Sequence, residues 1–162
     1  TLTHKTELGM VKLKLKTKKD VANAYDEIAD KGIPLDGILV QEWLDGDNRE
    51  FVLGSIRDPQ FGPCVMFGLG GVFTEALQDV SFRVAPITSI DAYEMMDELK
   101  TKKLLGAFRG SPAVDKEMLA GALVGLSELI NTYEEIAEID INPIIINGNK
   151  PVAVDALVIL KQ

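Results

Sequence analysis

The chain contains a single histidine, His4, and a single cysteine, Cys64, which narrows the chemistry open to it. One cysteine excludes a disulfide framework and a cysteine-cluster zinc site, and one histidine excludes a metal site with several histidine ligands. His4 lies in a polar segment close to Gly9. Two interpretations stay open: an ordinary surface residue, or a base, nucleophile or phosphoryl carrier.

Oxygen ligands are concentrated near the end of the sequence. Glu138, Asp140 and Asn142 alternate with isoleucines, so a strand would place them on one face. Asp155 interrupts the apolar run that follows, where a carboxylate is costly unless it is paired or binds a cation. Asn and Asp oxygens on adjacent strands suit Mg²⁺ beside a phosphate. The alternative is a capped turn with a solvated edge carboxylate.

A glycine run and two arginines are the remaining candidates for binding an anion. Successive amides of the run Gly68–Gly71 could form an anion-holding nest, although the run also fits a plain tight turn. Arg57 ends one predicted strand and Arg83 lies within another, where a guanidinium meets either a phosphate or a carboxylate of a structural ion pair. Lys5 is a further local cation.

Hydrophobic periodicity predicts the elements that position these residues. A helix is expected over 20–31, begun by Thr17 or Asp20 and ended by Gly32, and two more over 89–99 and 115–132. Gly68–Gly71 is expected to be irregular. Strands are expected over 10–16, 37–43, 50–56, 64–67, 80–84, 138–146 and 152–160; the second and third form a hairpin through a turn at 45–48, and the last two form another through Gly148. The pattern predicts an α/β fold with antiparallel hairpins.

Length and charge set the outer limits. A chain of 162 residues is long enough for one domain, and its formal net charge of −8 argues against non-specific binding to nucleic acid or anionic lipid. The hydropathy pattern lacks a membrane-spanning segment or a signal peptide, and the single cysteine fits a reducing compartment. A cytoplasmic protein that binds neither nucleic acid nor membrane is therefore expected.

The order of several motifs resembles one family. His4-Lys-Thr-Glu7, Arg57-Asp-Pro-Gln-Phe-Gly-Pro63, Met66-Phe-Gly-Leu-Gly-Gly71, Phe82-Arg-Val-Ala-Pro86 and Glu138-Ile-Asp-Ile-Asn-Pro143 together resemble the ATP-grasp domain of NDP-forming acyl-CoA synthetases. This group includes the β subunit of ADP-forming acetyl-CoA synthetase, and succinyl-CoA synthetase is a relative. The resemblance implies an ATP-grasp fold over 1–162, with a mixed or antiparallel sheet and flanking helices, that lacks the N-terminal part of the domain.

The resemblance also implies a phosphoryl relay in which acyl-CoA, phosphate and ADP give the free acid, CoA and ATP through phosphohistidine. His4 would carry the phosphoryl group and Asp140 would steady it. ATP or ADP would be bound by the segment Gln41, Glu42, Trp43 and Leu44 at the adenine, by Glu50 at the ribose, and by Arg57, Gly70 and Gly71 at the phosphates. Asn142 and Asp155 would bind Mg²⁺.

CoA would be bound by a partner, either an α subunit or a fused domain, in a homo- or hetero-oligomer. Without that partner we expect the chain to be inactive as an acid–CoA ligase. Three differences from the family are notable: Met10 replaces a glycine, Lys14 replaces a small residue, and Trp43 is bulky for the hinge. The alternatives are a regulatory ATP-grasp module of a protein lysine acetyltransferase and a non-catalytic assembly domain.

Overall fold

The chain divides into two units, residues 1–44 and 45–162, in a computed structural model that describes residues 8–44, 49–71 and 78–161. In the first unit, helix α1 spans Lys18–Ala29. Thr17 begins it with a capping box, since its side chain accepts a bond from the Asp20 amide while Asp20 bonds back to the Thr17 amide. The prediction of a helix here is confirmed, with Thr17 as its cap.

The predicted strands over 10–16 and 37–43 are wrong, because neither segment forms a strand in the described part of the first unit. A strand needs a paired neighbour for its backbone amides and carbonyls, and neither segment has one there. The predicted hairpin between 37–43 and the strand beginning at Glu50 is therefore also wrong; its turn at 45–48 lies outside the described residues.

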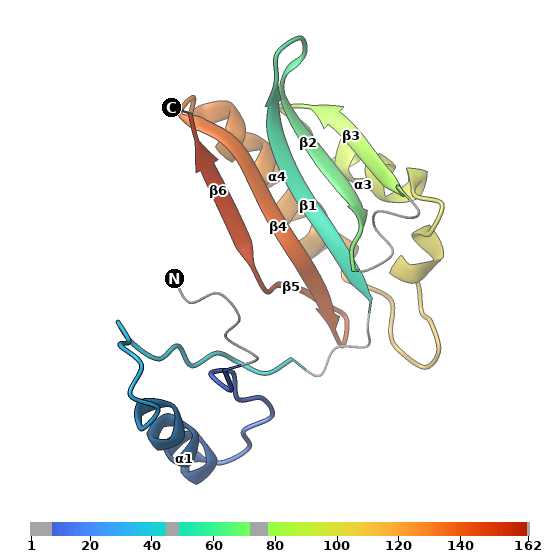
Figure 1. Cartoon of the computed structure of the whole chain (residues 1–162). Coiled ribbons are helices and arrows are strands. Elements are labelled where there is room, and N and C mark those ends of the chain that lie inside the picture. The colour runs from blue at the N-terminus through green and yellow to red at the C-terminus, as the bar shows by residue number, and fades with distance from the viewer. Residues whose placement is uncertain (1–7, 45–48, 72–77, 162) are drawn as a thin grey trace. The chain divides into compact units, whose positions relative to one another are not determined.

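The second unit is built on one antiparallel sheet (Figure 1). Within the described residues the strands run in the order β3-β2-β1-β4-β5, and β6 also pairs with β4. Their bounds are Glu50–Asp58 (β1), Gly62–Leu69 (β2), Val80–Val84 (β3), Ile136–Asn147 (β4), Lys150–Ala153 (β5) and Ala156–Leu160 (β6). The expected α/β architecture with an antiparallel sheet and flanking helices is confirmed.

Two strand predictions need correction. The predicted single strand 152–160 is two strands, because the chain leaves the ladder at Val154–Asp155 and resumes as β6. Gly68 and Leu69 are not irregular but end β2, where Gly68 pairs with Val52 and Leu69 with Phe51. A Cβ on Gly68 would lie 2.6 Å from Val80 Cγ1, so the close approach of β3 excludes a side chain there.

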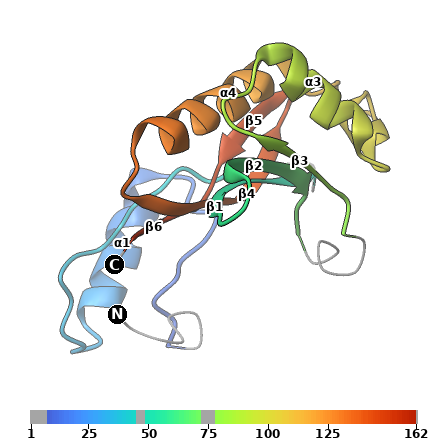
Figure 2. The same cartoon turned by 90° about the horizontal axis from the view of Figure 1, so that it is seen from above.

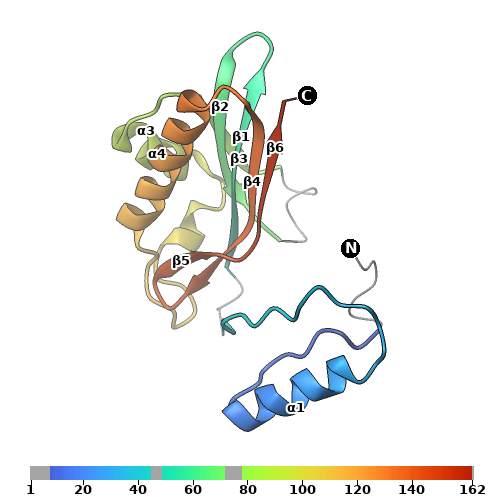
Figure 3. The ribbon, with the colours of Figure 1, turned by 90° about the vertical axis from the view of Figure 1, so that its left-hand side faces the viewer.

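The helices cover one face of the sheet (Figures 2 and 3). Helix α3 spans Ser89–Glu98, the 3-10 helix η1 spans Lys102–Leu105, and α4 spans Lys116–Thr132. Their buried residues, among them Met95, Leu119 and Leu123, pack against Phe51 and Phe67 of the sheet. The opposite face, which we call the open face, carries the alternate residues of each strand.

Register shows which residues belong to the open face. Gly54 of β1 pairs with Met66 of β2 and with Asp140 of β4, whereas the neighbouring Leu53 is fully buried under the helices. Asp140 therefore lies on the open face. The sheet thus separates an apolar core from a surface on which charged residues are tolerated.

Leu123 tests this description of the core. The side chain is fully buried in α4, and Leu123→Ala should lower the free energy of unfolding by about 2–5 kcal/mol because it leaves a cavity. Leu129→Ala, in the same helix but 40% exposed, is the matched control and should change it far less. Urea unfolding of both variants measures the difference; equal losses would contradict the packing.

Candidate active site

Glu50 and the glycines that follow β2 lie together at one end of the sheet. The Gly70 amide donates to the Glu50 carbonyl at 2.7 Å, which fixes the two segments side by side. Gly71 has a φ of +77°, and a Cβ on it would lie 2.9 Å from Glu50 Oε2. The Glu50 carboxylate therefore packs directly against Gly71, in a space that a larger residue would fill. One predicted nest donor, the Gly70 amide, is already used by the sheet.

A pocket opens at this end of the sheet. It has a volume of about 360 Å³ and is lined by Arg49, Glu50, Leu69, Leu104, Phe108, Arg109 and Ser111. Apolar side chains together with the carboxylate of Glu50 and the guanidinium of Arg109 suit a small polar ligand. Sequence reasoning assigned no role to the 108–112 segment.

Arg49 shapes the pocket, although sequence reasoning missed it. The side chain is 4% exposed, and its guanidinium donates to the carbonyls of Leu104, Gly106, Pro112 and Gly148 at 3.0–3.3 Å. These bonds fix the loop that carries Phe108 and Arg109 to the start of β1. An arginine directly before a predicted strand was the available signal, but it lay within a charged stretch typical of a turn.

Asn142 and Asp155 are adjacent, as the proposed metal site requires. The backbone amide of Asn142 donates to the backbone carbonyl of Asp155 at 3.2 Å, and both side chains are exposed. Asp155 Oδ1 accepts a bond from the Ala156 amide at 2.9 Å, which orients the carboxylate. One amide oxygen and one carboxylate fit Mg²⁺, which commonly takes one or two protein carboxylates and completes its shell with phosphate and water.

Asp140 lies on β4 two residues before Asn142, half-buried on the open face. Glu50 pairs with Ile145 of the same strand, which places it roughly 10 Å along the sheet from Asn142. Glu50, Gly70 and Gly71 thus lie at the end of the surface that carries the candidate metal ligands.

Arg57 lies elsewhere. It is seven residues from Glu50 along β1, roughly 23 Å away. Its Nε donates to the Ile136 carbonyl at 2.7 Å, and its Nη2 donates to the carbonyls of Tyr133, at 2.8 Å, and Ile130. The guanidinium therefore binds carbonyls at the end of α4, where the helix dipole favours a cation. The structure does not bring Arg57 together with the glycines.

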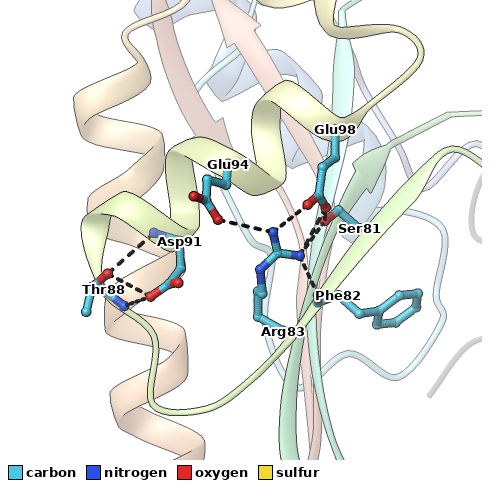
Figure 4. Close-up of polar contacts among 7 residues, drawn as sticks. All are labelled: Ser81, Phe82, Arg83, Thr88, Asp91, Glu94 and Glu98. Carbon is cyan, nitrogen blue, oxygen red and sulfur yellow. Dashed lines mark hydrogen bonds and ion pairs between the residues drawn. The ribbon is translucent and has the colours of Figure 1, made fainter.

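Arg83 is engaged by helix α3 (Figure 4). Its guanidinium forms ion pairs with Glu98 and with Glu94 at 2.5 and 3.5 Å, and the Ser81 hydroxyl also donates to Glu98. The bonds from Arg83 and Ser81 lower the pKa of Glu98 to about 2. The structural ion pair, one of the two interpretations of Arg83, is what the structure shows.

The remaining predicted residues belong to the first unit. Gln41, Glu42, Trp43 and Leu44 have irregular backbone, and the Nζ of Lys14 lies 5.6 Å from the centre of the Trp43 ring. Lys14 and Trp43, two positions expected to differ from the family, therefore interact with each other. His4 and Lys5 lie outside the described residues.

The ion pair of Glu98 makes the stability of the second unit depend on pH. Because its folded pKa lies below the usual 4.5, its stabilising contribution is complete above pH 4.5 and is lost as pH falls toward 2. Glu98→Gln should therefore remove part of the acid sensitivity of unfolding over that range. Urea unfolding between pH 2.5 and 7 tests this; parallel curves for Glu98→Gln and wild type would contradict it.

Comparison with known proteins identifies the family of the chain. The sequence profile of the ATP-grasp domain matches residues 1–160. The chain is 44% identical to the β subunit of acetate–CoA ligase [ADP-forming] I from Pyrococcus furiosus, over 98% of this chain and 71% of that subunit. It is 39% identical to acetate–CoA ligase [ADP-forming] I of Archaeoglobus fulgidus, of which it spans 24%.

A solved structure is also similar. The dinucleotide-forming acetyl-coenzyme A synthetase 1 of Candidatus Korarchaeum cryptofilum superimposes with a TM-score of 0.85 at 46% identity, over 99% of this chain and 72% of that chain. That protein is in complex with coenzyme A and Mg-AMPPCP, with its phosphohistidine segment pointing towards the nucleotide-binding site. The chain therefore belongs to the ATP-grasp domain family and corresponds to the ATP-grasp part of the ADP-forming acyl-CoA ligases.

Proposed function

We propose that this chain is the nucleotide-binding part of an ADP-forming acyl-CoA ligase that converts acyl-CoA, ADP and phosphate to the acid, ATP and CoA. The observation that carries the proposal is the shared surface at one end of the sheet, with Glu50 against Gly71 and Asn142 beside Asp155. The Glu50 carboxylate can accept hydrogen bonds from the ribose hydroxyls. The metal ligands lie roughly 10 Å away along the sheet, a separation that suits the phosphates of the same nucleotide.

Each residue has a distinct role in this proposal. Glu50 accepts hydrogen bonds from the ribose, and the backbone of Gln41–Leu44 binds the adenine. Asn142 and Asp155 would hold Mg²⁺, which when bound neutralises phosphate charge. Gly70 and Gly71 leave room for phosphate oxygens to approach the backbone. Because Arg57 and Arg83 bind the helices, we assign them to the scaffold.

The phosphoryl relay is assigned to His4. The phosphoryl donor is an acyl phosphate, formed when phosphate displaces CoA from acyl-CoA. A ring nitrogen of the neutral imidazole attacks its phosphorus, so that an N–P bond forms as the P–O bond to the acyl group breaks and the carboxylate leaves as the free acid. A β-phosphate oxygen of ADP then attacks the same phosphorus; the N–P bond breaks, ATP forms and the imidazole is restored. Asp140 would stabilise the charged phosphohistidine through its carboxylate.

The proposal has three further parts. The acyl substrate is acetyl-CoA, the partner is an α subunit or fused domain that binds CoA, and the location is the cytoplasm. The β-subunit relative and the coenzyme A complex of the synthetase support the first two. The single cysteine of the chain supports the third. None of the described helices has the length and hydropathy of a membrane-spanning segment.

The metal ligands are tested by Asp155→Asn and Asn142→Ala in the intact ligase. Each removes one ligand of Mg²⁺ and should weaken Mg-ADP binding about 10- to 100-fold, while ADP without metal binds nearly as before. Calorimetry with and without Mg²⁺ measures both. Asp58→Asn, on the β1–β2 turn at the far end of the sheet, is the control and should leave both affinities unchanged.

The relay is tested by incubating the intact ligase with γ-labelled ATP and Mg²⁺. Label on this chain should be acid-labile and alkali-stable, as a phosphoramidate is, and should disappear in His4→Asn. Acid-stable label, or label that persists in His4→Asn, would show that another residue carries the phosphoryl group. Absence of both label and Mg-nucleotide binding would favour a non-catalytic assembly role.

A further inference from the structure

The pocket at the start of β1 contains two opposite charges that do not pair with each other. Glu50 and Arg109 both line it. Among residues 49–71 and 78–161, neither side chain takes part in an ion pair or a hydrogen bond. A carboxylate accepts hydrogen bonds from hydroxyl groups, whereas a guanidinium binds carboxylate or phosphate. The pocket is therefore suited to a ligand that has hydroxyl groups next to an anionic group.

The size of the pocket limits how far apart those groups can lie. Its volume of about 360 Å³ is at the lower end for ligand pockets, so Glu50 and Arg109 contact neighbouring parts of one ligand. In a nucleotide the α-phosphate is bonded directly to the ribose, and the outer phosphates extend away from it. If Glu50 binds the ribose, the α-phosphate is the anionic group nearest to Arg109. The candidate metal ligands, roughly 10 Å from Glu50 along the sheet, suit the outer phosphates.

The other arginines of the chain already have partners in the fold. Arg49 and Arg57 donate to backbone carbonyls, and Arg83 forms ion pairs with carboxylates of α3. Among the described residues, Arg109 is thus the arginine that leaves its donors for a ligand. A phosphate in this pocket also needs a cation, because the Glu50 carboxylate would otherwise repel it.

Arg109 is carried by a turn that the fold holds in place. The Phe108 amide donates to the Ser111 carbonyl at 3.1 Å, and the Ser111 amide donates back at 2.9 Å, so Arg109 and Gly110 form a two-residue hairpin turn. Arg49 binds carbonyls on both sides of this turn. The Arg109 guanidinium also lies 5.3 Å from the centre of the Phe108 ring, which restricts its position. A side chain that is held in place before the ligand arrives binds it at lower entropic cost.

The geometry of the turn gives no reason for an arginine at position 109. The φ angle is +46° at Arg109 and +88° at Gly110, so both central residues lie in the left-handed region. Asn-Gly is a preferred pair for a turn of this kind, because asparagine and glycine adopt positive φ more readily than other residues. Arginine is less favourable there than asparagine, so its role lies in what the side chain binds.

We propose that Arg109 binds the α-phosphate of the nucleotide whose ribose is bound by Glu50. This inference rests on the proposed function and adds a residue to its site. The contact is a charge-assisted hydrogen bond that needs no metal ion, so it contributes equally with and without Mg²⁺. It therefore differs from the contributions of Asn142 and Asp155, which act through the metal.

The test measures binding of adenosine, AMP and ADP to the intact ligase by calorimetry, with Mg²⁺ and with EDTA. Arg109→Asn should weaken the binding of AMP and ADP at least tenfold in both conditions, because each carries an α-phosphate, and should leave the affinity for adenosine unchanged. Arg109→Lys keeps the charge but not the bidentate geometry, and should give a smaller loss.

A second readout separates binding from a structural role. Asparagine suits the positive φ of position 109, so Arg109→Asn should keep or raise the Tm of the ligase while it weakens AMP binding. The matched control is Lys103→Gln, because Lys103 is an exposed residue of η1 outside the pocket and the variant changes the net charge by the same amount. It should leave all three affinities unchanged.

Equal binding of AMP and ADP by wild type and Arg109→Asn would overturn the proposal and leave the proposed function intact. A loss for adenosine as well, together with a lower Tm, would show a structural role and would also overturn it. A loss for ADP without a loss for AMP would contradict the α-phosphate contact and place Arg109 at the β-phosphate. Wild type that binds no nucleotide would contradict the proposed function itself, and the Arg109 contact with it.

Discussion

The register between β1 and β4 is the constraint on which the second unit depends. Leu53 pairs with Ile141 and Gly54 with Asp140, and side chains alternate between the faces with a period of two. A slip of β4 by one residue against β1 would turn Asp140 into the helix-covered core and expose Ile139. The burial of Ile139 and Ile144 in the same core as Phe51 and Leu53 opposes that slip, so the apolar core also fixes the face on which the polar residues lie.

Several charged side chains of the second unit form hydrogen bonds with backbone groups. Arg49 donates to carbonyls of the 104–112 loop, and Arg57 donates to the carbonyls of Tyr133 at the end of α4 and of Ile136 at the start of β4. Asp79 has the converse role, since its carboxylate accepts the Lys100 and Thr101 amides. Burial raises the pKa of Asp79, but the bonds from Thr101 and Lys100 outweigh it, and the pKa stays below its usual range.

The sequence left two partners open for the strand arginines, a phosphate or the carboxylate of a structural ion pair, but Arg57 binds a third kind of partner, backbone carbonyls. A folded sheet with helices on one side has its own buried acceptors, and a guanidinium with five donors satisfies several at once. Arg83 likewise binds groups of the folded chain itself, in an ion pair with Glu98 of α3. At the pocket, Arg109 forms no ion pair with the described residues, and its guanidinium lies 5.3 Å from the centre of the Phe108 ring.

The sequence by itself determined the helices 89–99 and 115–132, most strands of the sheet, the adjacency of Asn142 and Asp155, and the family. These follow from short-range periodicity and from motif order, which are properties of the linear chain. Tertiary structure alone decided that 10–16 and 37–43 form no strands, that Val154–Asp155 divides a strand, and that Arg57 binds backbone carbonyls. Those outcomes depend on which segments pair and which carbonyls lack partners, and that information exists only when distant parts of the chain are brought together.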